Sequence, residues 1–146
     1  MWSKNFRAFL AALASMVLLA ACSDTDIAAQ RAARAAKATG DIVVGVSWPF
    51  STAKGRLWEG VAMAQEEINA AGGVLGRKLV FVKEDDQLSV TKGTVIAHKF
   101  AENLDMVAVI GTLNSYIAIP TAPVYEFAGM VMLTQGSSVV RLTNQG

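Results

Sequence analysis

Residues Trp58–Asp86 read WEGVAMAQEEINAAGGVLGRKLVFVKEDD, a stretch that contains a helix, a turn and a strand in succession. Four apolar side chains recur at helical spacing near its start, with charged and amide side chains on the other faces: Leu57, Val61, Ala64 and Ile68. Gly72 and Gly73 end this helix, because glycine takes up the left-handed conformation without a Cβ penalty. The apolar run Leu79–Val82, rich in β-branched and aromatic residues, then predicts a buried strand.

Further apolar runs extend this unit into a sheet. Ile42–Val46 precedes the helix and completes a βαβ unit, for which parallel pairing and a right-handed crossover are the default. Met106–Gly111 and Met130–Thr134 predict a third and a fourth strand. A second helix is expected from Ser89 or Val90, and a third from near Pro120 and Pro123 toward Phe127, because helices tolerate proline chiefly in their first turn. The predicted fold class is α/β, a parallel sheet with helices on both faces.

The same residues carry a resemblance to a known family. The run EEINAAGGVLGRKL, followed by EDD, resembles the opening of the periplasmic solute-binding proteins of the leucine/isoleucine/valine-binding type, which are subunits of ABC importers. The resemblance continues through Val109–Gly111, Ser115, Pro120, Tyr125, Glu126, Gly129, Leu142 and Thr143 to Gly146. It implies a Rossmann-like lobe of a type I periplasmic binding protein. Because this family is built of two lobes, the chain is expected to be an incomplete, N-terminal fragment whose residues 41–146 form part of the first lobe.

The beginning of the chain has the layout of a secretory signal. Lys4 and Arg7 precede an apolar run, and small residues follow it up to Ala21, which predicts a signal peptide over residues 1–21. The sequence Leu-Ala-Ala before Cys22 fits the bacterial lipobox, so Cys22 is the predicted lipidation site. A free thiol and a transmembrane anchor are the alternatives, but the apolar run is shorter than the ~20 residues that a spanning helix needs. The predicted location is the periplasm or cell envelope, with lipid anchoring to a membrane.

Residues 22–40 are rich in alanine and are interpreted as a lipid-anchored tether. Helix propensity is high here, yet large apolar residues are absent after Ile27, so the segment has little to bury. The cations Arg31, Arg34 and Lys37 are then expected to be solvated, or alternatively to touch anionic lipid.

The binding site is expected at the carboxyl ends of the strands, where open α/β sheets bind ligands. The predicted ligand-binding residues are Trp48, Phe50, Ser115, Tyr116, Gly136 and Ser138. The two aromatic residues of the first loop either flank a ligand or pack on a neighbouring loop. The resemblance implies that Ser115, Gly136 and Ser138 hold the α-carboxylate and α-ammonium groups of an amino acid. Tyr116 departs from the small residue usual in the family, and it is expected either to narrow the pocket or to re-aim it. Alternatively, Ser115 is a helix N-cap, and Ser137 and Ser138 cap a helix that begins near Val139.

The resemblance implies that the protein binds a small polar solute outside the cytoplasm, a branched-chain or other amino acid, and delivers it to the membrane subunits of an ABC importer. A sensor domain of a signalling receptor is the alternative, since the same fold serves both roles. An enzyme is less favoured, because the chain has no G-x-x-x-x-G-K-[ST] or G-x-S-x-G motif and only one histidine, His98. No metal or cofactor is expected, and the formal net charge of +1 indicates no nucleic-acid partner.

A four-stranded parallel sheet without a second lobe also leaves one sheet edge uncovered. Uncovered edges favour pairing between chains. The sequence therefore predicts that this chain is oligomeric or poorly soluble.

Overall fold

The computed structural model describes residues 26–144 of the 146-residue chain. Its elements are α2 (Ile27–Lys37), β1 (Ile42–Trp48), α3 (Leu57–Ala70), β2 (Leu79–Asp85), α4 (Val90–Glu102), β3 (Met106–Ile110), α5 (Ser115–Phe127), β4 (Val131–Leu133) and α6 (Val140–Thr143). The predicted signal segment, the predicted lipidation site Cys22 and the last residue, Gly146, lie outside the described residues.

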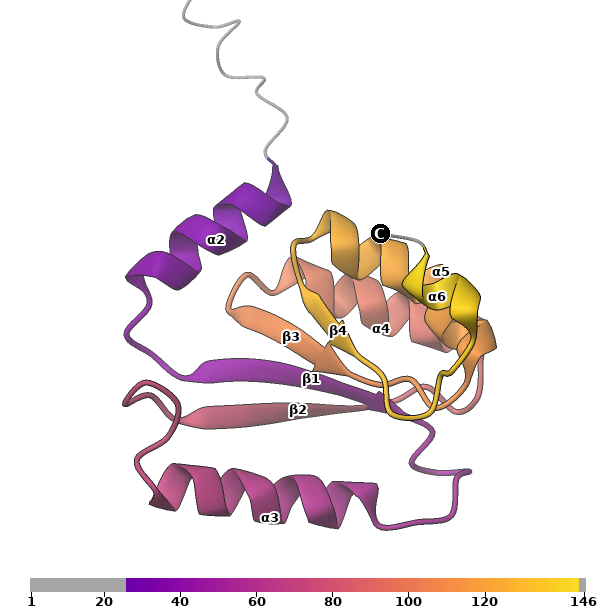
Figure 1. Ribbon diagram of the computed structural model, residues 1–146, viewed down its shortest axis with the longest axis horizontal. Helices are drawn as coiled ribbons and strands as arrows, with labels where there is room; N and C mark the ends of the chain where they lie inside the picture. The colour runs from indigo at the N-terminus through magenta and orange to yellow at the C-terminus, as the bar shows by residue number, and fades with distance from the viewer. Residues whose placement is uncertain (1–25, 145–146) are drawn as a thin grey trace, which may run out of the picture.

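The four strands form one parallel sheet in the order β2-β1-β3-β4. Helix α3 lies along one face, and α4 and α5 cover the other (Figure 1). This confirms the predicted α/β fold with helices on both faces. Because the strands are parallel, the loops that follow β1, β2, β3 and β4 all emerge at the same edge of the sheet.

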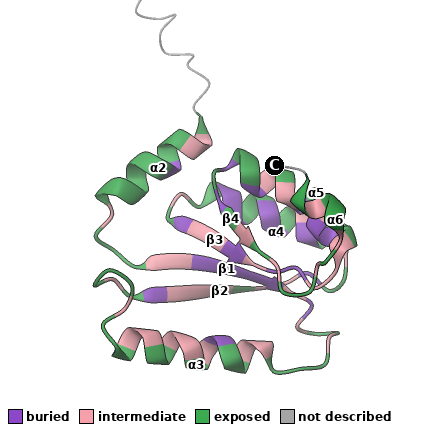
Figure 2. Ribbon diagram, in the orientation of Figure 1, coloured by how far each residue is buried: buried purple, intermediate pink, exposed green. Residues whose placement is uncertain are grey.

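The core lies between the sheet and the pair α4 and α5, where the buried colouring of Figure 2 is concentrated. Its largest fully buried side chains include Tyr125, Phe100 and Met106. Glycine is required at Gly45 of β1, since a Cβ there would lie only 2.5 Å from the Phe100 ring. Phe100 therefore packs directly against β1.

Helix α5 begins earlier than the sequence predicted. It starts at Ser115, with Pro120 and Pro123 inside it and both exposed, so the expectation of a start near the prolines was wrong. Packing outweighs the cost of the prolines, because Ile117 is fully buried against Gly93 of α4, where an added Cβ would lie 2.4 Å from the Ile117 side chain. Consequently Ser115 and Tyr116 belong to the first turn of the helix and not to the loop.

Helix α2 corrects the interpretation of residues 26–38 as a tether with little to bury. Arg31 is 3% exposed, and its guanidinium donates to the carbonyl oxygens of four residues: Ala101 at 2.5 Å, Asn103 at 2.9 Å, Met106 at 3.3 Å and Ala128 at 2.8 Å. Three of these carbonyls lie at the carboxyl ends of α4 and α5, which lack intrahelical donors and carry the negative end of the helix dipole. The absence of large apolar residues after Ile27 did not predict this docking, because the side chain that holds α2 on the domain is the cation Arg31.

A second cation of α2 is also engaged. The Arg34 guanidinium forms an exposed ion pair with Asp105 in the turn before β3. The expectation that the α2 arginines are simply solvated was therefore wrong, and α2 is docked on the domain.

Candidate functional site

Two loops at the carboxyl edge of the sheet lie in contact. The Ser137 hydroxyl, in the loop after β4, donates to the carbonyl oxygen of Thr112, in the loop after β3, at 2.9 Å. Thr134 donates to the Ser137 carbonyl at 3.1 Å and stabilises the turn after β4. A Cβ on Gly136 would lie 2.6 Å from the Leu113 carbonyl oxygen, so this close approach depends on glycine. The loop that leads into Ser115 at the start of α5 and the loop that contains Gly136 and Ser138 are thus neighbours.

A second close approach fixes the start of the loop after β3. Gly111 has a φ of +126°, and an added Cβ would lie 1.9 Å from the Ser47 carbonyl oxygen of β1. No other residue type fits there without moving β1 or the loop. The loop from Thr112 to Asn114 is therefore held from both sides, by β1 and by Ser137.

Ser115 occupies the first position of α5, directly after the N-cap residue Asn114. Its half-buried side chain makes no hydrogen bond to any described residue, and the backbone N–H groups of Ser115 and Tyr116 precede the first intrahelical bonds, which begin at Ile117. The amino terminus of α5 thus presents N–H groups and a hydroxyl that can donate to an anion.

Neither predicted serine is a helix cap. Asn114, not Ser115, is the N-cap of α5, and Val139, not Ser138, is the N-cap of α6. Ser138 is exposed, and its hydroxyl makes no hydrogen bond within residues 26–144. The capping alternative is therefore wrong for both side chains, which leaves their hydroxyl groups available.

Tyr116 is half exposed and is tied to another loop at the same edge. Its hydroxyl donates to the carbonyl oxygen of Leu88, before α4, at 3.1 Å and accepts from the Asn114 side chain at 3.1 Å. Tyr116 therefore joins the loop after β2 to the amino terminus of α5.

Trp48 and Phe50 lie in a separate cluster beside α3. The Phe50 ring meets the Trp58 ring edge to face at 6.0 Å between centroids, and the Lys83 ammonium lies 4.3 Å from the Phe50 centroid and 5.1 Å from that of Trp58. The cavity of about 230 Å³ that these residues line is not lined by Ser115, Tyr116, Gly136 or Ser138. The structure thus places Ser115, Tyr116, Gly136 and Ser138 on neighbouring segments at one end of the sheet. Trp48 and Phe50 line a separate pocket, in which Phe50 packs on Trp58.

Asp86 joins the end of β1 to the loop after β2. It is fully buried, accepts from the backbone N–H of Leu88 at 3.0 Å and from the Ser47 hydroxyl at 3.4 Å, and burial raises the pKa of its carboxyl group. Asp85 accepts from the N–H of Ser51 at 3.1 Å, which ties the loop after β1 to the end of β2. The acidic pair therefore holds the loops after β1 and β2 in place.

Two residues that hold the site were not predicted, Thr112 and Ser137. Thr112 contributes a backbone carbonyl, which every residue type offers, and Ser137 is one of two adjacent serines, so the sequence carried no signal that singled them out. Within the described part of the chain, no group of His, Cys, Asp and Glu side chains has an arrangement for a metal ion, and no helix has the length and apolar character needed to cross a bilayer.

Comparison with known proteins gives concordant matches. The model of the periplasmic binding protein family matches residues 41–145. An amino acid binding protein of Pseudomonas aeruginosa is 34% identical over 113 residues, which cover 75% of this chain and 30% of that protein. The Leu/Ile/Val-binding protein homolog 2 of Brucella abortus is 34% identical over 102 residues, 67% of this chain and 27% of that protein.

Among solved structures, the chain is similar to an ABC transporter substrate-binding protein from Desulfitobacterium hafniense, solved in complex with Leu. The identity is 47% and the TM-score 0.70, over 73% of this chain and 32% of that one. A putative branched-chain amino acid ABC transporter protein from Rhodospirillum rubrum is 25% identical, with a TM-score of 0.65 over 71% and 31% of the two chains. The chain thus spans about 30% of the length of the curated relatives it matches.

Proposed function

The chain belongs to the periplasmic binding protein family, and from this premise we propose that it provides part of the first lobe of an extracytoplasmic binding protein for an amino acid, with a branched-chain amino acid as the first candidate. Similarity to a Leu/Ile/Val-binding protein homolog and to a substrate-binding protein solved with Leu supports this choice of ligand. The role proposed is binding and delivery to the membrane subunits of an ABC importer, not catalysis.

The proposal depends on one observation, the hydrogen bond from the Ser137 hydroxyl to the Thr112 carbonyl that joins the loops after β3 and β4. It brings the first turn of α5 close to the turn at Gly136. A carboxylate at the amino terminus of α5 would accept from the Ser115 hydroxyl and from free backbone N–H groups. An ammonium group beside it would donate to the Gly136 carbonyl or to the Ser138 hydroxyl.

The other predicted residues enter the proposal in different ways. Tyr116 is proposed to border the site, since its hydroxyl is fixed by Leu88 and its ring is half exposed. Trp48 and Phe50 are proposed to contact the ligand side chain only if the separate aromatic cluster opens toward the α5 amino terminus. We propose further that residues 1–21 are a signal peptide and that Cys22 is acylated, with the binding lobe beginning at residue 41.

The test is titration calorimetry of the full-length protein, with both lobes, against leucine, isoleucine, valine, glutamate and lysine. Leucine, isoleucine or valine is expected to bind, and Ser115→Ala is expected to weaken that binding by about 1 to 3 kcal/mol, because a charged group loses a hydrogen-bond donor. The matched control is Thr91→Ala, which removes an exposed hydroxyl from the first turn of α4 and is expected to leave the affinity unchanged. Equal affinity in wild type, Ser115→Ala and Ser138→Ala would show that the ligand does not bind at these loops.

A further inference from the structure

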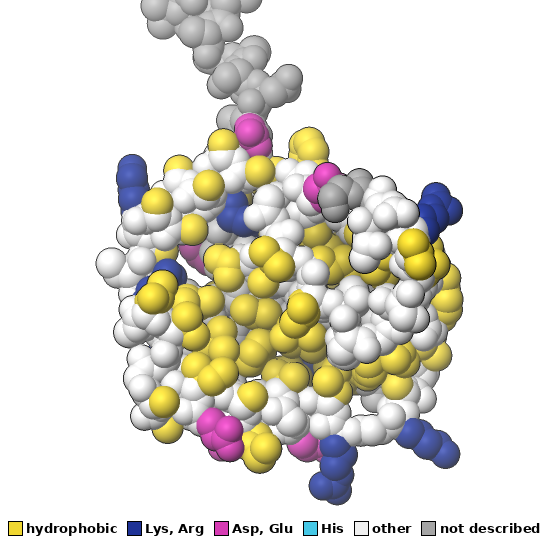
Figure 3. Space-filling model, viewed as in Figure 1, with side chains coloured by type: hydrophobic (Ala, Val, Ile, Leu, Met, Phe, Trp, Pro, Cys, Tyr) yellow, Lys and Arg dark blue, Asp and Glu magenta, His cyan; other side chains and the backbone are white. Residues whose placement is uncertain are grey.

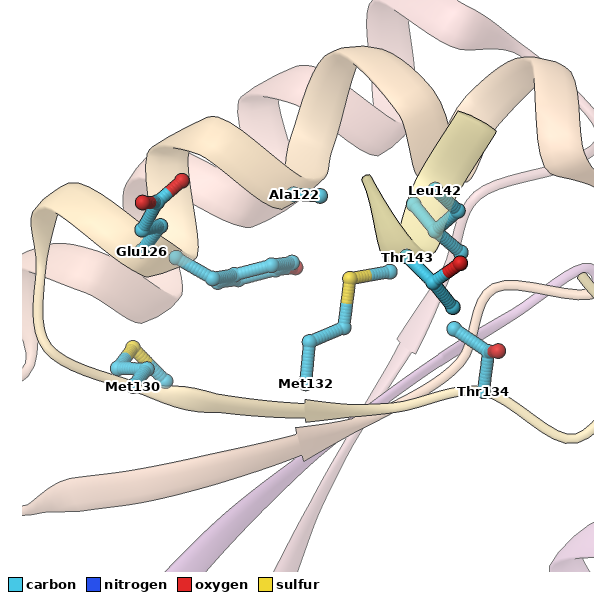
Figure 4. A pocket seen from close by; sticks show the side chains of 8 residues that line it. Ala122, Glu126, Met130, Met132, Thr134, Leu142 and Thr143 are labelled. Atoms are coloured by element: carbon cyan, nitrogen blue, oxygen red, sulfur yellow. The ribbon is translucent and has the colours of Figure 1, made fainter. Parts of the chain in front are cut away.

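Helix α5 is held by different kinds of contact at its two ends. Its carboxyl-terminal half packs through apolar side chains, since Tyr125 is buried in the core and Met132 extends from β4 toward α5 and α6 (Figure 4). Hydrophobic side chains also gather across the middle of the face that Figure 3 shows, and most charged side chains lie at its margin. At the start of α5, the side chains of Asn114 and Tyr116 add hydrogen bonds that can be removed without opening the core.

Asn114 is the N-cap residue of α5, yet its side chain does not cap the helix. An N-cap asparagine ordinarily accepts, through its side-chain oxygen, the backbone N–H two or three residues further along the helix. Here the Asn114 amide group donates to the Tyr116 hydroxyl at 3.1 Å instead. The N–H of Ile117 donates to the Asn114 backbone carbonyl at 3.0 Å. The N–H of Tyr116 is therefore the group that a capping Asn114 side chain would engage.

The orientation of the Asn114 amide is fixed by the second partner of the Tyr116 hydroxyl. This hydroxyl has one hydrogen, and it donates that hydrogen to the carbonyl oxygen of Leu88 at 3.1 Å, because a carbonyl can only accept. The hydroxyl oxygen is then left to accept from the Nδ2 group of Asn114. The Leu88 carbonyl thus determines, through Tyr116, which way the Asn114 side chain is turned.

Leu88 presents this carbonyl from a strained loop. Gln87 and Leu88 have φ angles of +52° and +59°, and two successive residues other than glycine persist in the left-handed region only where their surroundings hold them. Asp85 accepts from the N–H of Gln87 at 3.0 Å. The fully buried Asp86 accepts from the N–H of Leu88, also at 3.0 Å. The acidic pair therefore fixes the conformation that places the Leu88 carbonyl against the start of α5.

We propose that the Tyr116 hydroxyl is a positioning group for the carboxylate of the ligand: it keeps the Asn114 side chain turned away from the amino terminus of α5, so the Tyr116 N–H stays free to donate to that carboxylate. This inference rests on the proposed function, and it gives Tyr116 a task other than shaping the pocket. The ligand binds at a helix terminus that is already uncapped, and it does not have to displace the Asn114 side chain first.

Tyr116→Phe tests this inference in the full-length protein, with both lobes, because it removes the hydroxyl and keeps the ring. The released Asn114 side chain then caps α5 and competes with the ligand. The affinity for a branched-chain amino acid, measured by titration calorimetry, is expected to fall about fivefold, the fold-change that corresponds to a cap of ordinary strength.

A second substitution identifies the cause of that loss. Tyr116→Phe/Asn114→Ala has no side chain that can cap α5, and it is expected to regain most of the lost affinity. The matched control is Tyr116→Phe/Thr91→Ala, which changes an exposed residue in the first turn of α4 and is expected to bind as weakly as Tyr116→Phe alone. A double variant with Asn114→Ala that stays as weak as this control would overturn the inference.

Amide hydrogen exchange of the ligand-free protein separates this inference from the proposed function. The N–H at position 116 is expected to exchange more slowly in Tyr116→Phe than in wild type, because the Asn114 side-chain oxygen then accepts from it. It is expected to exchange as fast as in wild type in Tyr116→Phe/Asn114→Ala. This measurement needs no ligand, so a protein that binds no amino acid would overturn the proposed function alone. Equal exchange at position 116 in wild type and Tyr116→Phe would overturn the positioning role.

Discussion

The carboxyl group of Asp86 is the clearest case of a single residue that ties stability to pH. Burial is the main cause that raises its pKa above the ordinary value of 3.8, and the hydrogen bonds from Leu88 and Ser47 only partly oppose this effect. Because the native pKa is higher than the unfolded one, the native state binds more protons in the interval between the two values. The Asp86 contribution to stability is therefore present at low pH and is lost as the pH rises through the native pKa.

Asp86→Asn removes this titration and preserves the shape of the side chain. The variant is expected to have a free energy of unfolding at pH 7 equal to or above that of wild type, and to lack the loss of stability that wild type shows as the pH rises above 3.8. Urea denaturation followed by circular dichroism at pH 4, 5 and 7 measures the difference.

Asp85→Asn is the control, because the pKa of Asp85 is shifted in the opposite direction from that of Asp86. Burial acts to raise the Asp85 pKa, but hydrogen bonds from Ser51 and Gln87 outweigh it and lower the pKa, so the ionised form is the one that stabilises the fold. Asp85→Asn is thus expected to lose stability at pH 7. A stability loss at pH 7 in Asp86→Asn as well would contradict the assigned direction for Asp86.

At the scale of elements, α2 is predicted to be stabilised by one side chain. Arg31→Ala withdraws a guanidinium from four carbonyl oxygens, three of which end α4 and α5, and leaves buried acceptors without donors. The expected loss in the free energy of unfolding is about 1 to 3 kcal/mol. Urea denaturation of the full chain measures it.

Arg34→Ala is the matched control, since it removes an arginine of the same helix whose partner, Asp105, is exposed. Its effect is expected to be clearly smaller than that of Arg31→Ala. If the two variants lose equal stability, the buried carbonyl contacts are not what holds α2 on the domain.

The elements show what a sequence reveals and what it does not. The strands, α3 and α4 were predicted because apolar periodicity marks any element that buries an apolar stripe, and α4 begins at Val90, one of the two expected positions. Helix α2 was missed because its buried side chain is Arg31, which periodicity counts as polar. The start of α5 was missed because packing of Ile117 on Gly93 outweighs the local preference of Pro120.

The site was predictable to the same limited degree. Adjacent loops at one sheet edge follow from parallel strands, so the neighbourhood of Ser115 and Gly136 could be expected. The hydrogen bond that joins these loops involves a backbone carbonyl of Thr112, and no pattern of side chains encodes it. The separation of Phe50 from them follows from its contact with Trp58, which depends on how the loop after β1 folds back on α3.

At the scale of the whole molecule, the lipobox sequence before Cys22 predicts that this residue is acylated. Wild type is expected to incorporate labelled palmitate, and Cys22→Ser is expected to lose the label, because Cys22 is the only cysteine of the chain. Fractionation after labelling measures both label and location. Label that persists in Cys22→Ser would contradict acylation at this residue.

Docking of α2 sets the length of the segment that would link an acylated Cys22 to the domain. A chain that was free from Cys22 to residue 40 would span up to about 60 Å when fully extended, whereas from Cys22 to Asp26, the N-cap of the docked helix α2, the limit is about 14 Å. Docking through Arg31 thereby shortens the greatest distance between an acylated Cys22 and the domain roughly fourfold. An acylated form would lie close to the lipid headgroups, so a reporter dye on α3 should lie within energy-transfer distance of a labelled bilayer. Arg31→Ala releases α2 from the domain and should increase that distance.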